Sequence, residues 1–391
     1  MREAQLVTTQ ADLDAALFRM HGARRFALDT EFMRESSYYP QLCLVQVATD
    51  SDCFLIDPLA GLELGGLHEL LAQRALPKIL HAARQDLEVL FLSGGRVPGP
   101  VFDTQVAAAL LGAAPQLGYA DLVASRLGHS LDKAQTRTDW SRRPLTDAQL
   151  AYAADDVRHL LQLHTELTAE LEARGRAGWL AEDAAALEDP ALYRGDPGLA
   201  WRRLKGLGRL KPAEQAAARA LAVWREQRAM TADRPRGWIL ADESLYALAL
   251  RRPASLDELG AIPALPAGTV RRSGEELLAL IATARDAPAP DDLEPPPQRP
   301  TPEQQALQAR LMQTVRGAAE ALGIGPEVLA TRRDVDALAQ GDRNGALLRG
   351  WRREAIGLRL LAVLDARGGG PGSRPPPSRS PRTPRPSAGL H

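Results

Sequence analysis

The chain has 391 residues, 45% of them hydrophobic and 25% charged, with a formal net charge of −1 at neutral pH. These values are ordinary for a soluble globular protein, and the length allows two or three domains with cores of their own. The N-terminus lacks the apolar segment of a signal peptide and no run is long enough to cross a bilayer, so we expect a cytoplasmic protein without a membrane partner.

The first part of the chain is typical of a sheet covered by helices. Strands that come first and helices that are then interleaved predict a mixed α/β sheet with helices on its faces. Cys43 and Cys53 lie in adjacent predicted strands, and an isolated pair in a chain of this kind favours buried thiols over a disulfide. The predicted strands are 24–32, 42–50, 52–58 and 77–83, and the predicted helices are 11–20, 64–74 and a segment from about Arg84.

Four carboxylates along this part of the chain form a candidate site. Asp29 and Glu31 are two apart within an apolar run, so on a strand both side chains project from one face. Asp86 falls in the first turn of a predicted helix. Tyr152 and Asp156 are four apart on a helical pattern and also share a face. Several hard oxygen donors in one cleft suit two divalent cations, an arrangement that serves hydrolytic phosphoryl transfer.

The Asp29–Glu31 pair also has a purely structural explanation. The tripeptide Asp-x-Glu occurs three times in the chain, and a pair at the end of an edge strand explains it equally well. Its apolar setting favours a functional pair, because buried charges are costly unless metals or partners compensate them. The occurrence of all four carboxylates in this one part of the chain favours the metal site over the structural explanation.

The predicted helix that carries Tyr152 and Asp156 has a recognisable start. Thr146 and Gln149 match the capping-box pattern. An apolar stripe along this helix suits docking on the sheet, which would place Tyr152 and Asp156 near Asp29. The stripe consists of Leu150, Val157, Leu160, Leu161 and Leu167.

The segment before this helix is polar, basic and aromatic. Arg137 and Trp140 are candidates to grip the terminal nucleotides by phosphate contact and stacking, and a structural loop packed by Trp140 is the alternative. We expect His81 to be a satisfied, partly buried histidine, because imidazole is not a ligand that Mg²⁺ favours. The sequence contains no zinc-like cluster, phosphate-binding loop or dinucleotide fingerprint.

From Trp201 the chain changes to short predicted helices with a surplus of positive charge. Residues 201–252 carry twelve Arg and Lys against five Asp and Glu, a surplus that suits contact with phosphates. We expect Trp201, Trp224 and Trp238 to pack in the core rather than to serve as stacking platforms. The candidate RNA-binding residues here are Arg202, Arg203, Lys205 and Lys211.

Proline-rich stretches divide the second half of the chain. Residues 286–302 hold seven prolines, which is typical of a linker, and residues 367–391 hold seven prolines, five arginines and no acid, which predicts a disordered basic tail. The expected division is a catalytic domain at 1–180, a connector at 181–204, a helical domain at 205–288, a Pro-rich linker at 289–302, a second helical domain at 303–366 and the tail.

Taken together, the motifs resemble those of the DEDD exonucleases and, within them, the ribonuclease D family. Tyr152 is similar to the residue that defines the tyrosine branch. The resemblance is strong over residues 1 to about 180 and looser beyond, where 205–288 resembles the HRDC domain, a small helical nucleic-acid-binding module, and 303–366 resembles a degenerate second copy. The stretches that carry it are YYPQLCLVQVAT (38–49), FDTQVAAALLG (102–112) and LDKAQTRTDWSRRPLTDAQLAYAADDVRHLL (131–161).

This resemblance implies a ribonuclease H-like α/β exonuclease domain followed by two small all-α HRDC-like domains. It implies two Mg²⁺ or Mn²⁺ ions and a Tyr152 hydroxyl that orients the attacking water. The activity implied is 3′→5′ removal of nucleotides from structured RNA such as tRNA precursors, with release of 5′-monophosphates. Separately, we expect the protein to be a monomer. A DNA exonuclease of the same superfamily and a non-enzymatic RNA-binding scaffold stay open as alternatives. The metal ligands implied are Asp29, Glu31, Asp86 and Asp156.

Overall fold

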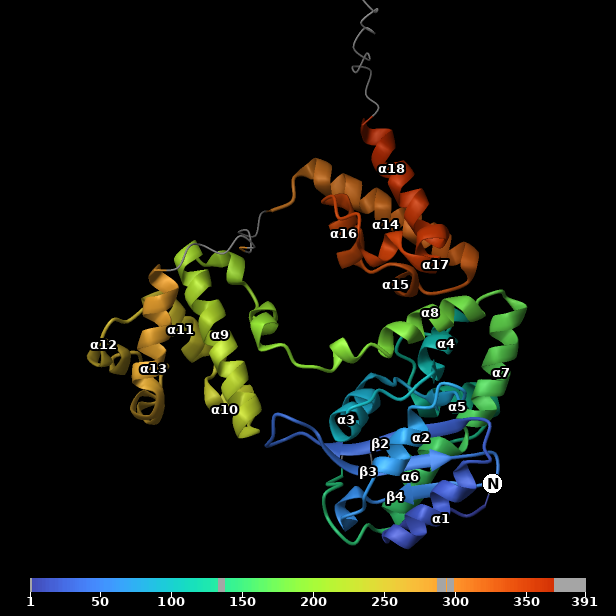
Figure 1. Cartoon of the computed structure of the whole chain (residues 1–391). Coiled ribbons are helices and arrows are strands. Elements are labelled where there is room, and N and C mark those ends of the chain that lie inside the picture. Colours follow the sequence, from blue (N-terminus) through green and yellow to red (C-terminus); the bar gives the residue numbers. More distant parts are fainter. Residues whose placement is uncertain (1, 133–137, 287–292, 294–298, 369–391) are drawn as a thin grey trace, which may run out of the picture.

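The computed structural model describes residues 2–132, 138–286, 293 and 299–368, and it consists of a helix-covered sheet and two helical units (Figure 1). The predicted RNA contact Arg137, most of the Pro-rich linker and the basic tail from residue 369 lie outside the described residues. Among the residues described, no helix is long and apolar enough to span a membrane.

A mixed sheet of six strands forms the centre of the first unit, as the sequence predicts. The strands lie in the order β1-β4-β3-β2-β5-β6, with β2 antiparallel to β3 and parallel to β5. The predicted strands do not include β1 and β6, the three-residue strands at the two edges of the sheet. The strands are β1 (Gln5–Val7), β2 (Phe26–Met33), β3 (Gln41–Ala48), β4 (Cys53–Ile56), β5 (Lys78–Leu80) and β6 (Val101–Asp103).

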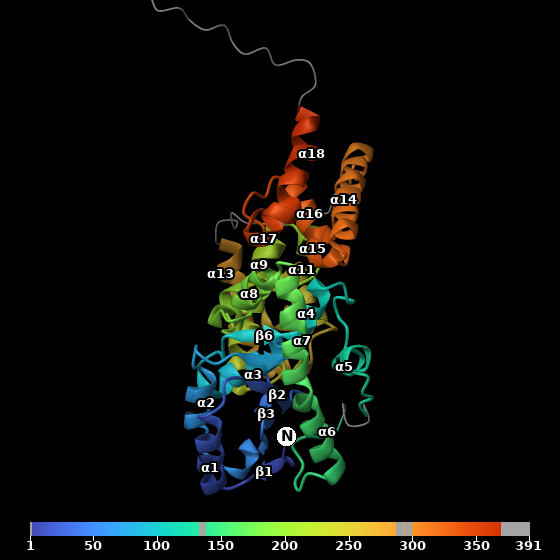
Figure 2. The ribbon, with the colours of Figure 1, turned by 90° about the vertical axis from the view of Figure 1, so that its right-hand side faces the viewer.

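Helices cover both faces of this sheet, and Figure 2 shows α1 and α2 on one side and α5, α6 and α7 on the other. Apolar residues of α1, α2 and α3 pack with Phe26 and Leu28, whereas those of α4 to α7 pack with Ala27. The helices are α1 (Gln10–Met20), α2 (Gly65–Leu71), α3 (Arg84–Gly94), α4 (Thr104–Leu110), α5 (Tyr119–Leu127), α6 (Asp147–Arg158), α7 (Leu160–Ala173) and α8 (Ala177–Leu187), and η1 (Pro58–Ala60) is a 3₁₀ turn.

The alternation of side chains along β2 determines the face of the sheet on which each acidic side chain lies. Asp29 and Glu31 follow Ala27 in the two-residue period and therefore share the face on which α6 lies. The pairing with β3 shifts register directly after Glu31. Such irregularities re-aim side chains and are frequent beside functional sites. Both free cysteines, Cys43 and Cys53, are buried thiols, as expected.

Helix α6 begins where the sequence predicts. Thr146 Oγ1 accepts from the Gln149 backbone N–H at 3.2 Å, and Gln149 Oε1 accepts from the Thr146 N–H at 3.0 Å, so the capping box is complete. The helix is shorter than the apolar stripe indicates, because α6 and α7 are separate helices. The break lies at His159, whose backbone N–H also faces the Tyr119 hydroxyl at 3.3 Å.

Two helical units follow the sheet. The first has a core of its own built on α9 and α11, with Leu221, Leu245 and Leu277 fully buried. Its helices are α9 (Pro212–Ala232), α10 (Arg236–Ile239), α11 (Asp242–Arg251), α12 (Leu256–Gly260) and α13 (Ala267–Asp286), preceded by η2 (Pro190–Leu192), η3 (Pro197–Arg203) and η4 (Leu207–Arg209). The second contains α14 (Pro302–Leu322), α15 (Pro326–Leu329), α16 (Arg332–Ala339), η5 (Ala346–Leu348), α17 (Gly350–Arg352), η6 (Arg353–Gly357) and α18 (Leu358–Gly368).

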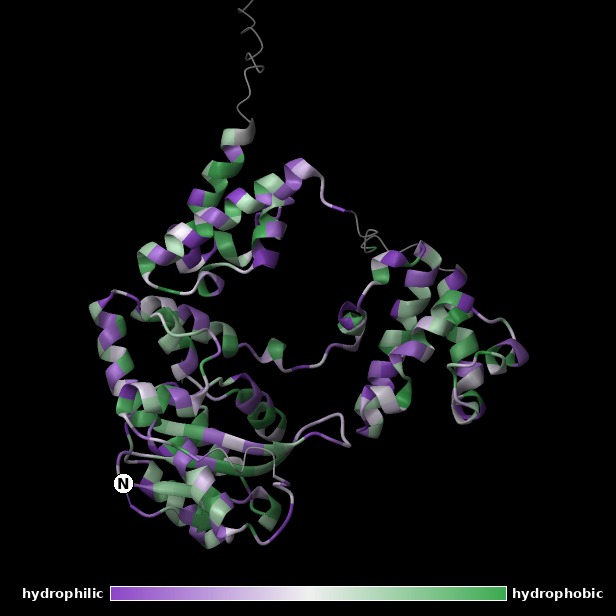
Figure 3. Ribbon diagram, turned by 180° about the vertical axis from the view of Figure 1, so that it is seen from behind, coloured by the Kyte–Doolittle hydropathy of each residue, from purple (hydrophilic) through white to green (hydrophobic). Residues whose placement is uncertain are grey.

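The second helical unit is docked on α8 and shares a hydrophobic core with the sheet unit (Figure 1). The rings of Trp179 and Trp351 stack with their centroids 4.2 Å apart. Arg352 forms two hydrogen bonds with Asp183, at 2.5 and 3.0 Å. Figure 3 shows apolar segments in this unit on the side that meets the sheet unit. The contact is a packed interface between distant parts of the sequence.

Candidate active site

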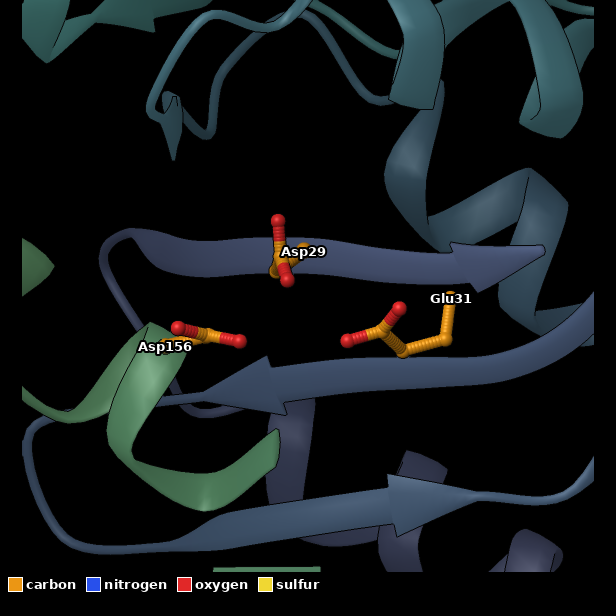
Figure 4. Close-up of side chains that lie close together, drawn as sticks. All are labelled: Asp29, Glu31 and Asp156. Atoms are coloured by element: carbon orange, nitrogen blue, oxygen red, sulfur yellow. The ribbon is translucent and has the colours of Figure 1, made fainter. Parts of the chain in front are cut away.

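Three of the predicted carboxylates meet at the face of the sheet that α6 covers. Asp29 and Glu31 extend from β2 and Asp156 from α6, and one oxygen of each lies within 4.8 Å of the others (Figure 4). All three side chains are partly accessible. The spacing argument therefore places the strand pair and the helix residue correctly beside one another.

Helix α6 lies close to the sheet because its inward face is small and apolar. Ala153, Ala154 and Val157 are buried between α6 and the strands. Tyr152 and Asp156 flank this face, one turn apart, and a hydrogen bond from the Tyr152 hydroxyl to the Asp156 carboxylate joins them. The predicted neighbours are thus brought together, with the phenol at the edge of the carboxylate cluster.

Asp86 approaches the cluster from the other side of β2. It lies in the first turn of α3, is buried, and accepts a hydrogen bond of 2.6 Å from the Thr30 hydroxyl. Thr30 stands between Asp29 and Glu31 on the strand and points to the opposite face. Asp86 is outside the set of three that lie within 4.8 Å, although it is near enough to raise the pKa of Asp29 and of Glu31.

A residue that the sequence interpretation misses, Asp103, holds the start of α3. Its carboxylate accepts from the backbone N–H groups of Ala82 and Ala83, at 3.1 and 2.9 Å, just before the helix begins. It also caps α4 through the N–H of Gln105 at 2.8 Å. Ala82 has a φ of 57°, a left-handed conformation that a non-glycine residue adopts at a cost. Asp103 therefore fixes the turn that aims Asp86.

Arg143, also missed, anchors the loop that leads into α6. Its guanidinium forms two hydrogen bonds of 2.6 Å with the buried Asp57 carboxylate. Further bonds reach the carbonyl oxygens of Cys43 at 2.7 Å and Trp140 at 2.8 Å. A bidentate arginine–carboxylate pair is among the strongest and most directional side-chain contacts. Arg143 ties the start of α6 to the strands that it covers.

Burial and mutual repulsion raise the pKa of every carboxyl group in the cluster. Burial, and then the charges of Asp86, Asp156 and Glu31, raise the pKa of Asp29 well above its usual range. Burial, followed by Asp156 and Asp86, raises the pKa of Glu31 to about 9. Burial likewise raises the pKa values of Asp86 and Asp156 to about 7. Such a set favours protons or cations, and an all-oxygen donor set fits hard divalent cations such as Mg²⁺ and Mn²⁺.

The other predicted residues near the site have structural partners. Trp140 is 2% exposed and packs against Tyr152, with ring centroids 6.1 Å apart, so its face is not available to a nucleotide and the packing alternative holds. Asp155 pairs with Arg158 at 3.3 Å, which leaves Asp156 as the cluster residue. His81 is satisfied, as expected: its Nδ1 lies 2.9 Å from Thr104 Oγ1 and its Nε2 lies 3.0 Å from the Leu117 carbonyl oxygen.

The four basic candidates lie in the first helical unit or just before it. Arg203 donates to the buried Glu226 at 2.7 Å, and Arg202 lies 5.4 Å from the ring centre of Trp201. Lys205 and Lys211 are exposed. Their exposure is compatible with phosphate contact.

Comparisons with known proteins find matches for both the sheet unit and the first helical unit. A model of 3′-5′ exonuclease domains matches residues 4–172, and a model of the HRDC domain matches residues 214–281. Ribonuclease D of Gluconacetobacter diazotrophicus is 40% identical over 93% of both chains, and that of Pseudomonas paraeruginosa is 41% identical over 87% of this chain and 92% of its own. The structure of Escherichia coli RNase D, an exoribonuclease involved in structured RNA processing, superposes with a TM-score of 0.84 at 32% identity, over 93% of this chain and 99% of that one. The chain therefore belongs to the ribonuclease D family of 3′→5′ exoribonucleases.

Proposed function

We propose that the protein removes 3′-terminal nucleotides from structured RNA, with 3′-extended tRNA precursors as its substrates, and releases 5′-nucleoside monophosphates. The convergence of Asp29, Glu31 and Asp156 beside Tyr152 carries this proposal. The similar Escherichia coli RNase D is described as acting in structured RNA processing. The groups named for the site all lie on one chain, so a second copy is not needed to complete it and a monomer is the proposed active form; the two free thiols suit the reducing cytoplasm.

Two divalent cations, Mg²⁺ or Mn²⁺, would be held by Asp29, Glu31 and Asp156, with Asp86 completing the set from α3. When bound, such a pair supplies an activated water and stabilises the departing 3′-oxygen. The phenol of Tyr152 orients that water by hydrogen bonding, because a phenol is a poor base at neutral pH. Asp103 and Arg143 keep the two helices that carry the ligands aligned with β2.

Replacement of Tyr152 by phenylalanine is expected to lower kcat about 10- to 100-fold, because the ring still packs against Trp140 while the orienting hydroxyl is lost. The Mg²⁺ concentration for half-maximal rate should change little. Steady-state kinetics at a series of Mg²⁺ concentrations measure both quantities. A rise in the required Mg²⁺ that accounts for the whole loss of rate would instead assign Tyr152 to positioning Asp156.

The direction and the end chemistry are tested with end-labelled RNA. An exonuclease of this design should shorten RNA with a free 3′-hydroxyl one nucleotide at a time, while a 3′-phosphate adds negative charge among four carboxylates and blocks the reaction. A sequencing gel resolves the products, and single-stranded DNA of the same sequence tests the DNA alternative. Internal fragments that appear before the single-nucleotide ladder, or equal rates on circular RNA, would contradict the proposal.

A further inference from the structure

An exposed tryptophan on the first helical unit contradicts the expectation that its tryptophans pack in the core. Trp224 is buried as expected, but Trp238 on α10 is 61% exposed. Among the described residues, Phe18 is the other aromatic side chain with such large exposure. The guanidinium carbon of Arg234 lies 5.7 Å from the centre of the Trp238 ring. An accessible indole beside an arginine is the pairing that stacks on a nucleobase and contacts its phosphate.

Helix α10 is tied to the loop between β2 and β3, the loop that continues the strand of Asp29 and Glu31. The carboxylate of Asp233 accepts from the backbone N–H groups of Tyr38 and Tyr39, both at 3.0 Å. In Figure 1 this loop reaches from the sheet to α10. Four residues separate Asp233 from Trp238, and four separate the end of β2 from Tyr38, so the position of Trp238 is set relative to the catalytic strand through two short segments.

A charge network around the buried carboxylate of Glu226 reinforces the same junction. Glu226 on α9 accepts from the Tyr38 hydroxyl at 2.6 Å and from Arg236 and Arg203, each at 2.7 Å. Burial alone would raise the pKa of Glu226, but the hydrogen bonds from Arg236 and Tyr38 lower it to about 2, so the group stays ionised and paired. Loss of a partner would leave the buried Glu226 carboxylate less compensated, so these contacts stabilise the junction.

We propose that Trp238 and Arg234 form an RNA-binding subsite that stacks an unpaired nucleobase upstream of the 3′ end held by the carboxylate cluster. The inference rests on the proposed function, because it takes the RNA to enter with its 3′ end at β2. The positive surplus of residues 201–252 matches a polyanion. Glu31 and Tyr38 are seven residues apart, so the backbone between them spans at most about 25 Å. We take the subsite to serve nucleotides within that reach, a few positions upstream of the cleaved bond.

The test compares Trp238→Ala with Phe18→Ala, a matched removal of an exposed aromatic ring on α1. Binding is measured in EDTA, by fluorescence anisotropy, with an unpaired RNA of about 15 nucleotides. Trp238→Ala should weaken binding about tenfold, and Phe18→Ala should leave it unchanged. Trp238→Phe should restore most of the affinity, and a fully paired RNA, whose bases are stacked on one another, should not distinguish Trp238→Ala from the wild type.

Turnover of a dinucleotide separates the subsite from the active site. A dinucleotide fits the carboxylate cluster but is too short to reach Trp238 at the same time. Trp238→Ala should therefore leave kcat/KM for the dinucleotide unchanged. Arg234→Gln should reduce the slope of log K against log salt concentration for the longer RNA by about one, the change expected when one phosphate contact is lost. Wild-type affinity of Trp238→Ala for the longer RNA, or an equal loss on the dinucleotide, would overturn the inference. A wild-type protein that shortens no RNA would instead reject the proposed function.

Discussion

Replacement of Asp156 by asparagine is expected to lower the rate of nucleotide release by about 10³-fold, because an amide oxygen is a weak and uncharged ligand where the cluster requires a carboxylate. Binding of RNA should persist, since the basic surface of the first helical unit is untouched. Rates are measured as 5′-monophosphate released from 3′-hydroxyl RNA at saturating Mg²⁺. Asp29→Asn should behave in the same way.

Asp155→Asn is the matched control for this experiment. The neighbouring carboxylate pairs with Arg158 outside the cluster, so its loss should change the rate little. Stability in EDTA provides a second readout: Asp156→Asn should melt at the same temperature as the wild type or higher, because a repelling carboxylate is removed. Equal rates for Asp155→Asn and Asp156→Asn would show that Asp156 is not a ligand.

Without divalent cations, the protein is expected to lose stability as pH rises from about 6.5 to about 8.5. The pKa values of Glu31, Asp86 and Asp156 are raised by folding, Glu31 to about 9 and the two aspartates to about 7. In this interval the folded cluster therefore binds more protons than the unfolded chain, and each such proton costs about 1.4 kcal/mol of unfolding free energy per pH unit. The stability that protonation provides is complete below the unfolded pKa values and is lost as pH passes the folded ones.

Mg²⁺ should remove this decline, because the cations replace the protons. Urea unfolding at pH 6.5 and 8.5, in EDTA and in Mg²⁺, measures the effect. Buried histidines such as His68 and His81 have lowered pKa values and act in the opposite direction at lower pH, which is why the interval begins near 6.5. Asp156→Asn should flatten the decline and weaken the gain from Mg²⁺. A free energy of unfolding in EDTA that stays level or rises between pH 6.5 and 8.5 would contradict the proposal that the folded cluster binds extra protons.

The cluster could be predicted from the sequence because the pairs Asp29/Glu31 and Tyr152/Asp156 each follow the period of a strand or a helix. Two residues on a strand and four on a helix fix which side chains share a face, and the capping box at Thr146 sets the start of α6. The mixed sheet was equally predictable from its longer strands. The resemblance to a known family added the chemistry that spacing alone does not specify.

Residues that act through long-range contacts were not predictable in this way. Asp103 reaches Ala83, twenty positions earlier, and Arg143 reaches Asp57, eighty-six positions earlier, and neither pairing has a sequence period. For the same reason the role of Trp140 stayed open between nucleotide contact and packing, and the expectation that Trp238 packs in the core was wrong. Composition does not say which aromatic ring the tertiary structure covers, and here it covers Trp140 and leaves Trp238 open.

The core that α8 shares with the second helical unit has a consequence for the order of synthesis. Helix α8 emerges from the ribosome well before α14–α18, which cover Trp179 and its neighbours. At ordinary elongation rates, translation from the end of α8 to the end of α18 takes on the order of 10–40 s. During that time an apolar surface of the nascent chain is open to chaperones or to other chains, and a product that terminates early keeps it open permanently. Synthesis of α14–α18 therefore buries the apolar surface that the sheet unit exposes until then.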